Sequence, residues 1–360
     1  MLLVLIPLFL IGLLPLIFGY TQIPSWLGLS EEFSLKGSFF DFLGEKFFNF
    51  IDIPIGRVGP FGTASLLLSL FIPLSISIFF MIAFSMKTKE LIKAKNQTKE
   101  LENEFNNSLF TLGNRLGDGV PAEIAFAKVA ESVRGQRTED FFRIVNTNIQ
   151  SMGMSLENAL FNSRRGALVY YPSNLISTSM RILIESAKKG LKVAAQSLMS
   201  ISEYVKNIQK INERLEDLLA DVVSDMRSNM TFLAPLLAGI VVGLASMITG
   251  ILNQLKVLTE AKTEAAITGL GNLANITRLF NVENMIPPYY MQISIGIYII
   301  EIIFILTSAL STIDSGEDKL KRTYETSRGL LKGGILYLIM AFIAIVSLSL
   351  LASIALRGVV

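Results

Sequence analysis

Five apolar runs constrain this chain more than any other feature of its sequence. They cover residues 1–18, 61–84, 231–252, 290–312 and 333–356. An α-helix of about 20 residues crosses the roughly 30 Å of hydrocarbon in a bilayer. Hydrophobic residues make up 51% of the chain and the mean hydropathy is +0.52, which is high for a soluble domain. The sequence therefore predicts an all-α, polytopic membrane protein with about five transmembrane helices.

The first run, residues 1–18, resembles a signal peptide in length. No basic residue precedes it and no A-x-A sequence follows it, and a prepilin leader would also need a basic residue and a small cleavage residue ahead of the run. We therefore expect it to be a spanning helix. The chain then divides into an N-terminal membrane region (1–86), a helical bundle (87–230) and a C-terminal membrane region (231–360).

Basic residues predict which parts of the chain face the cytoplasm. Residues 87–229 hold 20 Lys and Arg, whereas segments 20–60 and 253–289 hold 3 each. Cytoplasmic loops carry the excess of positive charge, most strongly close to the spans. The cluster directly after the second run consists of Lys87, Lys89, Lys93, Lys95 and Lys99. We therefore expect the bundle and the N-terminus on the cytoplasmic side of the cell membrane, and the C-terminus on the outer side.

The predicted outer segment contains the sequence FFDFLGEKFFNFI. Its apolar residues on one helical face are Phe39, Leu43, Phe47, Phe50 and Ile51. This pattern predicts an interfacial helix lying on the bilayer, with a lid packed against neighbouring helices as an equal alternative. On the same predicted side, Asn275 begins an Asn-Ile-Thr sequon and is a candidate glycosylation site.

The central region, residues 88–230, shows the periodicity of successive helices. Apolar residues at three- and four-residue steps predict a first helix over about 89–116, and Thr138 and Ser155 occupy positions where N-caps are expected. A further helix covers about residues 173–189. No Gly or Pro interrupts residues 191–228, so we expect this long helix to run straight into the third span.

A short phrase occurs twice in this region, as GDGVPAEIAFAKVAES from Gly117 and as GMSLENALF from Gly153. The recurring positions are Gly119, Pro121, Glu123 and Ala125, then Gly153, Ser155, Glu157 and Ala159. Glycine and proline or serine suit the end of one helix and the start of the next, and the glutamate suits the first turn. These residues are therefore expected to set helix starts and tight packing, with direct contact to a partner as the alternative.

The motifs resemble those of the type II secretion F family, which includes the platform proteins of pili and archaella. The resemblance covers about residues 105–255. It rests on Leu116 to Ala125, on Gly153, Ser155, Leu156, Ala159 and Leu160, on Glu185 and Gly190, and on the membrane span that follows. It implies a cytoplasmic bundle of about six helices, the type II secretion F domain. It also implies a scaffold that docks a hexameric secretion or pilus-assembly ATPase and couples it to the assembly of pilin or archaellin subunits. Many family members carry two such bundles and this chain has one, which implies a homodimer.

Three further sets of residues are candidate sites. Basic residues near helix ends are candidate contacts to an acidic ATPase surface, although a solvated face is the other interpretation. They are Arg134, Arg137, Arg164, Arg165, Lys188, Lys189 and Lys192. Gly239 and Gly243 form a GxxxG pattern, which predicts close helix packing within the chain or between two copies. Glu301 is the ionisable residue deep in a span, and we expect its carboxyl to face the bundle and bind a Ser or Thr.

The composition excludes several kinds of function. The chain has no cysteine and no histidine, which removes disulfides, thiol nucleophiles, Cys/His zinc sites and imidazole acid–base chemistry. No P-loop sequence is present, and the net charge of +2 gives no basic field for nucleic acid. We therefore expect that the protein is not an enzyme and that it has no catalytic residue, cofactor or metal site. A transporter or permease subunit is the alternative function, and a membrane-bound enzyme ranks third. The lack of Cys and His, with Ile-rich spans, favours an archaeal source.

Overall fold

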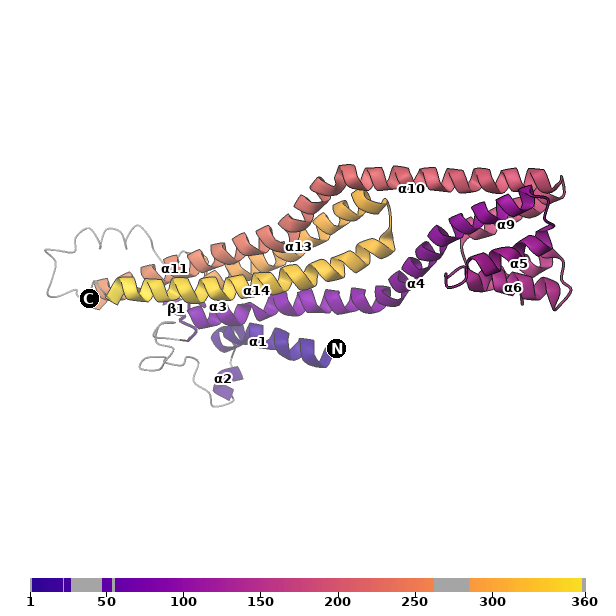
Figure 1. Ribbon diagram of the computed structural model, residues 1–360. Coiled ribbons are helices and arrows are strands. Elements are labelled where there is room, and N and C mark those ends of the chain that lie inside the picture. Colours follow the sequence, from indigo (N-terminus) through magenta and orange to yellow (C-terminus); the bar gives the residue numbers. More distant parts are fainter. Residues whose placement is uncertain (1, 22, 27–46, 54–55, 262–284, 358–360) are drawn as a thin grey trace. The chain divides into compact units, whose positions relative to one another are not determined.

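The computed structural model describes residues 2–21, 23–26, 47–53, 56–261 and 285–357, and nearly all of them lie in helices (Figure 1). The chain forms two compact units. Unit 1 comprises residues 1–88 and 221–360, and unit 2 comprises residues 89–220. The two predicted membrane regions thus belong to one unit, although the whole of unit 2 separates them in the sequence.

Unit 1 contains the apolar helices. Its helices and turns are α1 (Leu2–Tyr20), α2 (Ile23–Trp26), α3 (Thr63–Ser69), the first part of α4 (Phe71–Gly117), the last part of α10 (Leu191–Ser228), the π-helical turn η2 (Asn229–Leu233), α11 (Ala234–Ala261), α13 (Pro288–Ser315) and α14 (Lys319–Arg357). Four helical stretches among the described residues are long and apolar enough to cross a membrane: Thr63–Gly117, Leu191–Asn253, Pro288–Ser315 and Lys319–Ile354. They indicate a multi-pass membrane protein. The first predicted span corresponds to α1, whose described apolar stretch, Leu5–Tyr20, is shorter than the other four.

The second predicted span is built from α3 and the start of α4. The helix is interrupted at Leu70, three residues before Pro73. Proline has no N–H with which to bond the carbonyl one turn earlier, and its ring crowds that carbonyl, which accounts for the break. Beyond the break, α4 continues for 47 residues, so the span and the first helix of the predicted bundle form a single helix.

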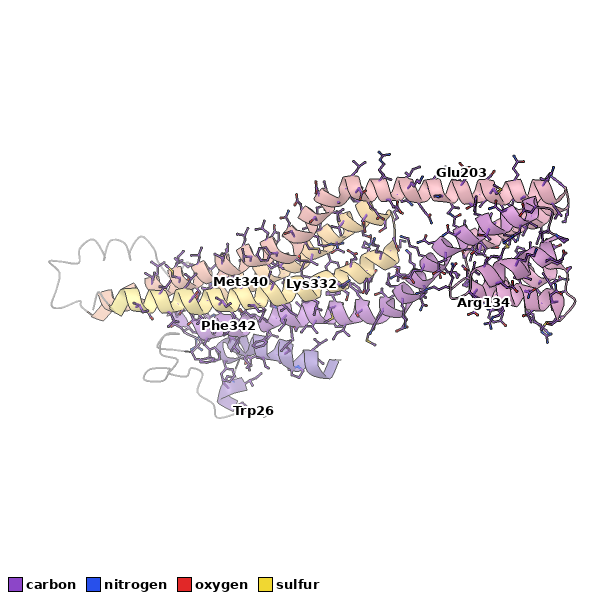
Figure 2. All side chains as sticks on the ribbon, in the orientation of Figure 1. Trp26, Arg134, Glu203, Lys332, Met340 and Phe342 are labelled. Carbon is purple, nitrogen blue, oxygen red and sulfur yellow. The ribbon has the colours of Figure 1, made fainter. Side chains whose placement is uncertain are left out.

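The core of unit 1 lies where α11, α13 and α14 pack together. The two glycines of the GxxxG pattern, Gly239 and Gly243, lie where α11 comes close to α14. A Cβ atom placed on Gly243 would lie 2.6 Å from Cβ of Ala344, and one on Gly239 would lie 2.8 Å from the backbone nitrogen of Ala341. Both neighbours are on α14, next to Met340 in Figure 2. The close packing predicted from this pattern is therefore made within the chain.

The described end of the outer segment does not belong to a helix, as an interfacial helix there would require. Phe39 and Leu43 lie outside the described residues, but residues 47–50 are not helical, and Ile51 begins a two-stranded antiparallel ribbon of β1 (Ile51–Ile53) and β2 (Gly56–Val58). Prolines and glycines between Ile53 and Phe61 oppose a helix here. Phe48 and Phe50 are buried, so at its end this segment packs into the protein.

Unit 2 is a helical domain around one apolar core. Its helices are the second part of α4, α5 (Ala122–Ser132), α6 (Glu139–Gln150), α7 (Leu156–Phe161), α8 (Ala167–Tyr170), α9 (Asn174–Ala187) and most of α10. At the centre are the fully buried rings of Phe105, Phe126, Phe141 and Phe142, with centroids 5.3–5.8 Å apart in the contacting pairs. Such pairs add to the free energy of burying their area.

The long helix of unit 2 continues into the third span as predicted, but it does so through a π-helical turn. Helix α10 ends at Ser228, and the five-residue π-helical turn η2 separates it from α11. The backbone N–H of Ala234 donates to the carbonyl of Asn229, five residues earlier. The next residue, Pro235, has no N–H to continue an α-helix. Proline at this position therefore accounts for the turn.

Candidate functional site

The three motif glycines act through backbone conformation. The φ angles of Gly119, Gly153 and Gly190 are +80°, +64° and +121°, values that residues with a side chain rarely adopt. A Cβ atom placed on any of the three would meet nothing within 4 Å. The tight packing expected at Gly119 and Gly153 is therefore not found around these two glycines, and all three glycines lie in the turns that follow α4, α6 and α9.

The other motif residues divide between packing and solvent. Ala125 and Ala159 are fully buried in the core of unit 2. Ser155 caps α7 as predicted, since its side chain accepts the N–H of Asn158. By contrast, Thr138 makes no such bond to α6, and its hydroxyl lies 3.4 Å from that of Ser108. The remaining residues of the motifs are exposed: Pro121, Glu123, Glu157 and Glu185.

The three motif turns gather at one end of unit 2, which we call the motif end. A Cβ on Gly117, in the first turn, would lie 3.6 Å from Cβ of Ala195, near the start of α10 and so close to the third turn. The second and third turns are also neighbours, since the charge of Glu157 acts on Lys188. The fold therefore brings together residues that are about 70 positions apart in the sequence.

Several of the candidate basic residues lie at this end. Arg165 is placed beside the second turn, with Nη1 3.8 Å from the sulfur of Met152. Lys188 donates to Oε1 of Glu185 at 3.0 Å, and this hydrogen bond and the carboxylate charge raise the pKa of Lys188 above its usual value. Arg164, Lys189 and Lys192 are exposed. The motif end thus presents exposed cations beside the exposed carboxylates of Glu123, Glu157 and Glu185.

Arg134 and Arg137 belong to the opposite end of unit 2. They lie in the turn between α5 and α6, where Figure 2 labels Arg134. Nη2 of Arg137 is 2.6 Å from Oε2 of Glu100, and its backbone N–H donates to Glu104. Glu100 precedes Gly117 by 17 residues of α4, which is about 26 Å of helix. The seven predicted basic residues therefore do not form one patch.

The predictions missed Asn148, which holds the Arg164–Arg165 loop in place. Its side chain is buried in α6, and Nδ2 donates to the carbonyls of Ala159 and Arg165 at 3.2 and 2.7 Å. A polar residue among the apolar positions of an amphipathic helix was the available signal, because a buried amide needs partners.

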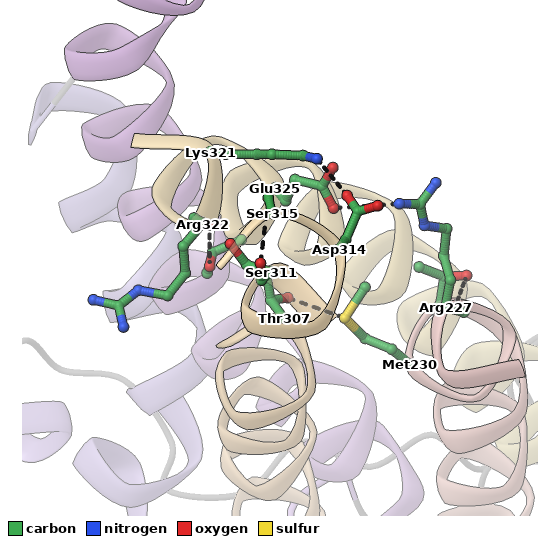
Figure 3. Close-up of polar contacts among 11 residues, drawn as sticks. Arg227, Met230, Thr307, Ser311, Asp314, Ser315, Lys321, Arg322 and Glu325 are labelled. Carbon is green, nitrogen blue, oxygen red and sulfur yellow. Dashed lines mark hydrogen bonds and ion pairs between the residues drawn. The ribbon is translucent and has the colours of Figure 1, made fainter. Parts of the chain in front are cut away.

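A second candidate site surrounds η2 in unit 1 (Figure 3). Met230 is buried in this turn and accepts a hydrogen bond from the Thr307 hydroxyl on α13, with oxygen and sulfur 3.0 Å apart. On α14, Gly329 and Gly333 leave room for it: a Cβ on Gly329 would lie 3.3 Å from Cε of Met230. The π-helical turn is thus held between α13 and α14.

Two ion pairs flank this turn at the ends of the same helices. Nη2 of Arg227 lies 3.4 Å from Oε2 of Glu325, and Lys321 pairs with Asp314 (Figure 3). These pairs join the end of α10 to α14, and α13 to α14. Partly exposed pairs contribute about 0–1 kcal/mol each, so their main effect is on orientation.

Glu301 does not face the bundle. It lies halfway along α13 on the exposed side, close to the strongly exposed Tyr298 and Ile305. Ser294 and Thr312 are exposed on the same face at helical spacing. Within the described part of the chain, no hydrogen bond or ion pair to the Glu301 carboxyl is found, so the predicted bond to a Ser or Thr is absent there. An ionisable side chain in this place is costly in hydrocarbon, which makes Glu301 a candidate contact for a group outside the chain.

The described residues contain no group of three or more acidic residues placed to hold a metal ion. Asn275 lies outside the described residues. Comparison with protein-family models, with curated proteins and with solved structures finds no match to this chain.

Proposed function

We propose that this chain is the membrane platform of a filament-assembly machine related to type II secretion and type IV pili. Unit 2 docks a hexameric ATPase through the motif end, and unit 1 receives pilin or archaellin subunits in the membrane. The observation that best supports the proposal is the gathering of the three family-like motif turns, with Arg165 and Lys188, at one end of one helical unit.

The proposed topology places unit 2 and the N-terminus in the cytoplasm and the C-terminus outside the cell membrane, with α1 as a fifth span. Ile6 and Leu10 of α1 are exposed, as expected for side chains that contact lipid. Tyr289 on α13 donates to the carbonyl of Gly12 at 2.7 Å, which ties α1 to the other apolar helices. The basic residues that follow the second span support the cytoplasmic assignment.

Force would pass between the units along the two helices that belong to both of them. Helix α4 continues from its apolar part to Gly117, and α10 leads through η2 into α11. Helix α10 alone is about 57 Å long for its 38 residues. A displacement at the motif end would be transmitted through this helix to the contacts of Met230. The exposed face of α13 around Glu301 would bind a transmembrane helix of a filament subunit.

A transporter would be expected to line a cavity with polar groups. One pocket among the described residues of unit 1 is lined mainly by apolar side chains, including Leu70, Ile299 and Ile303. The platform therefore has the stronger support.

Charge reversal at the motif end tests the proposal. The double variant Arg164→Glu, Arg165→Glu should abolish filaments and co-purification with the candidate ATPase, while the amount of chain in the membrane stays unchanged. Arg134→Glu at the opposite end of unit 2 is the matched control and should leave both intact. Normal filaments from the double variant would refute docking at this end.

A further inference from the structure

Among the described residues, most of an apolar stripe on α10 is left uncovered; only its first residue, Ile201, packs against the core of unit 2. From Ile201 the helix follows a seven-residue repeat, in which positions a and d lie on one side. Positions a are Ile201, Ile208, Leu215 and Val222, and positions d are Tyr204, Ile211, Leu218 and Asp225. Seven of these eight residues are apolar or aromatic, which is the pattern of a coiled-coil seam.

The seam is exposed along most of its length. Leu218 is 74% exposed and Ile211 is 54% exposed, and Tyr204, Ile208, Leu215 and Val222 are also classed as exposed. Isolated apolar residues are common on protein surfaces, but a continuous row at helical spacing marks a surface that another partner covers.

The contact between α10 and α4 is made by a different side of the helix. The hydroxyl of Ser202 donates to the carbonyl of Asn106 at 3.0 Å, and Nε2 of Gln209 donates to Oδ1 of Asn103 at 2.8 Å. Ser202 and Gln209 occupy position b of the repeat, so position d lies on roughly the opposite side of α10. The seam is therefore free to meet a second helix without displacing α4.

We propose that α10 pairs with α10 of a second copy of this chain as a parallel, in-register, two-stranded coiled coil. β-Branched residues at most a positions favour two strands. At positions e and g the charges are compatible with this arrangement, whereas Asp225 at the last d position would meet Asp225 of the other copy. Arg214 and Asp221 at position g would face the apolar Leu219 and Met226 at position e of the other helix, and the seam carries no other charge than Asp225. A parallel pair therefore brings no like charges together at positions e and g.

The direction of the pair follows from the chain. Because α10 continues through η2 into the apolar α11, two copies inserted the same way into one membrane present α10 in the same direction. An antiparallel pair would instead place the basic stretch 206–214 opposite the acidic stretch 216–225, and the experiment distinguishes the two arrangements. The proposal rests on α10 alone and stands whether or not the chain serves a filament.

The absence of cysteine makes a direct test possible, because each introduced cysteine is the sole thiol. Single variants Ile211→Cys and Leu218→Cys at position d, and Glu213→Cys and Ala220→Cys at position f, are oxidised in native membranes. In a parallel pair, the d variants should form disulfide-linked dimers at least tenfold faster than the f variants. Equal rates at d and f, or no dimer at d, would overturn the proposal.

Two further measurements test whether the cross-link depends on the apolar seam and whether the two helices run in the same direction. Leu218→Asp in the Ile211→Cys chain should abolish the cross-link, whereas Ala220→Asp on the far side should leave it. Co-expression of Tyr204→Cys with Val222→Cys chains that carry different tags should give no mixed dimer. A mixed dimer as abundant as the Ile211→Cys dimer would show the antiparallel arrangement and refute the parallel one.

Discussion

The motif glycines of unit 2 and the two GxxxG glycines of unit 1 serve opposite purposes. In unit 2, Gly119, Gly153 and Gly190 have positive φ angles and open space where a side chain would lie. In unit 1, Gly239 and Gly243 lie within α11, where a Cβ would come within 3 Å of atoms on α14. The first set changes the direction of the chain, and the second set lets two helices approach.

This difference follows from what surrounds each unit. In water, helices associate because they bury apolar side chains, as the four phenylalanines of unit 2 do, and glycine is needed where helices end. In a bilayer, lipid tails are as apolar as leucine, so helices associate through close packing of small residues. The glycine pattern of unit 1 is thus consistent with a membrane environment.

The largest effect is expected where the close approach is blocked. Gly243→Ala would place a Cβ 2.6 Å from Cβ of Ala344 and 2.8 Å from its carbonyl carbon, so α11 and α14 would have to separate. We expect a loss of about 1–3 kcal/mol in the free energy of unfolding, as for other overpacked cores. Thermal unfolding of the purified chain in detergent measures it.

Helix α11 also provides the control. Gly250→Ala would meet nothing within 4 Å, and alanine is the better helix former by about 1 kcal/mol. This variant should be as stable as the original chain or more stable. Equal losses for Gly243→Ala and Gly250→Ala would show that close approach is not what the glycines of unit 1 provide.

A smaller effect is expected at the motif glycines. Gly153→Ala has room for its side chain but strains the backbone at a φ of +64°, which costs about 1–2 kcal/mol. Gly153→Asn should lose less, because asparagine adopts this conformation more readily. Hydrogen exchange of the full chain should show faster opening around the second motif turn for alanine than for asparagine. The reverse order would contradict a conformational role.

The smallest effect concerns the charges at the motif end. Glu185→Gln removes the carboxylate that raises the pKa of Lys188, so that pKa should fall towards its usual value. In the original chain the folded-state pKa is the higher one. The pair therefore stabilises the fold below the ordinary lysine pKa of about 10.4, and this stabilisation is lost as the pH rises through the raised value. NMR titration of isotope-labelled lysine measures the pKa of Lys188 in both chains. An unchanged Lys188 pKa in the variant would contradict the assignment.

Much of unit 2 could be predicted from the sequence, since its helices alternate apolar and polar faces in water. The N-cap at Ser155, the helix that follows Ser173 and the helix ends before Gly119 and Gly190 all appear in the structure. Thr138 stands at the predicted N-cap position of α6, but its buried side chain makes no cap hydrogen bond. The Thr138 hydroxyl lies beside that of Ser108, which is on α4 and 30 residues earlier in the sequence.

Unit 1 was harder to predict because its helices are apolar on all sides. Nothing in the sequence of α13 distinguishes the face that packs from the face that is exposed, so Glu301 was assigned to the wrong one. Pro73 and Pro235 were readable signals for the break before α4 and for η2. The signal of Pro235 was missed because residues 191–228 before it contain no Gly or Pro and predict one uninterrupted helix.

The π-helical turn also bears on how related chains can differ in length. A π turn accommodates one more residue than an α-helical turn, so the helices before and after it keep the faces that they would have without that residue. The helical stretch Leu191–Asn253 has 63 residues, and Asn229–Leu233 is the place within it where one residue can be lost. Such a loss would leave the seam of α10 facing its proposed partner helix and would leave Gly243 facing α14. Alignment of relatives should place a single-residue gap here, and chains that have this gap should also lack a proline at the position of Pro235.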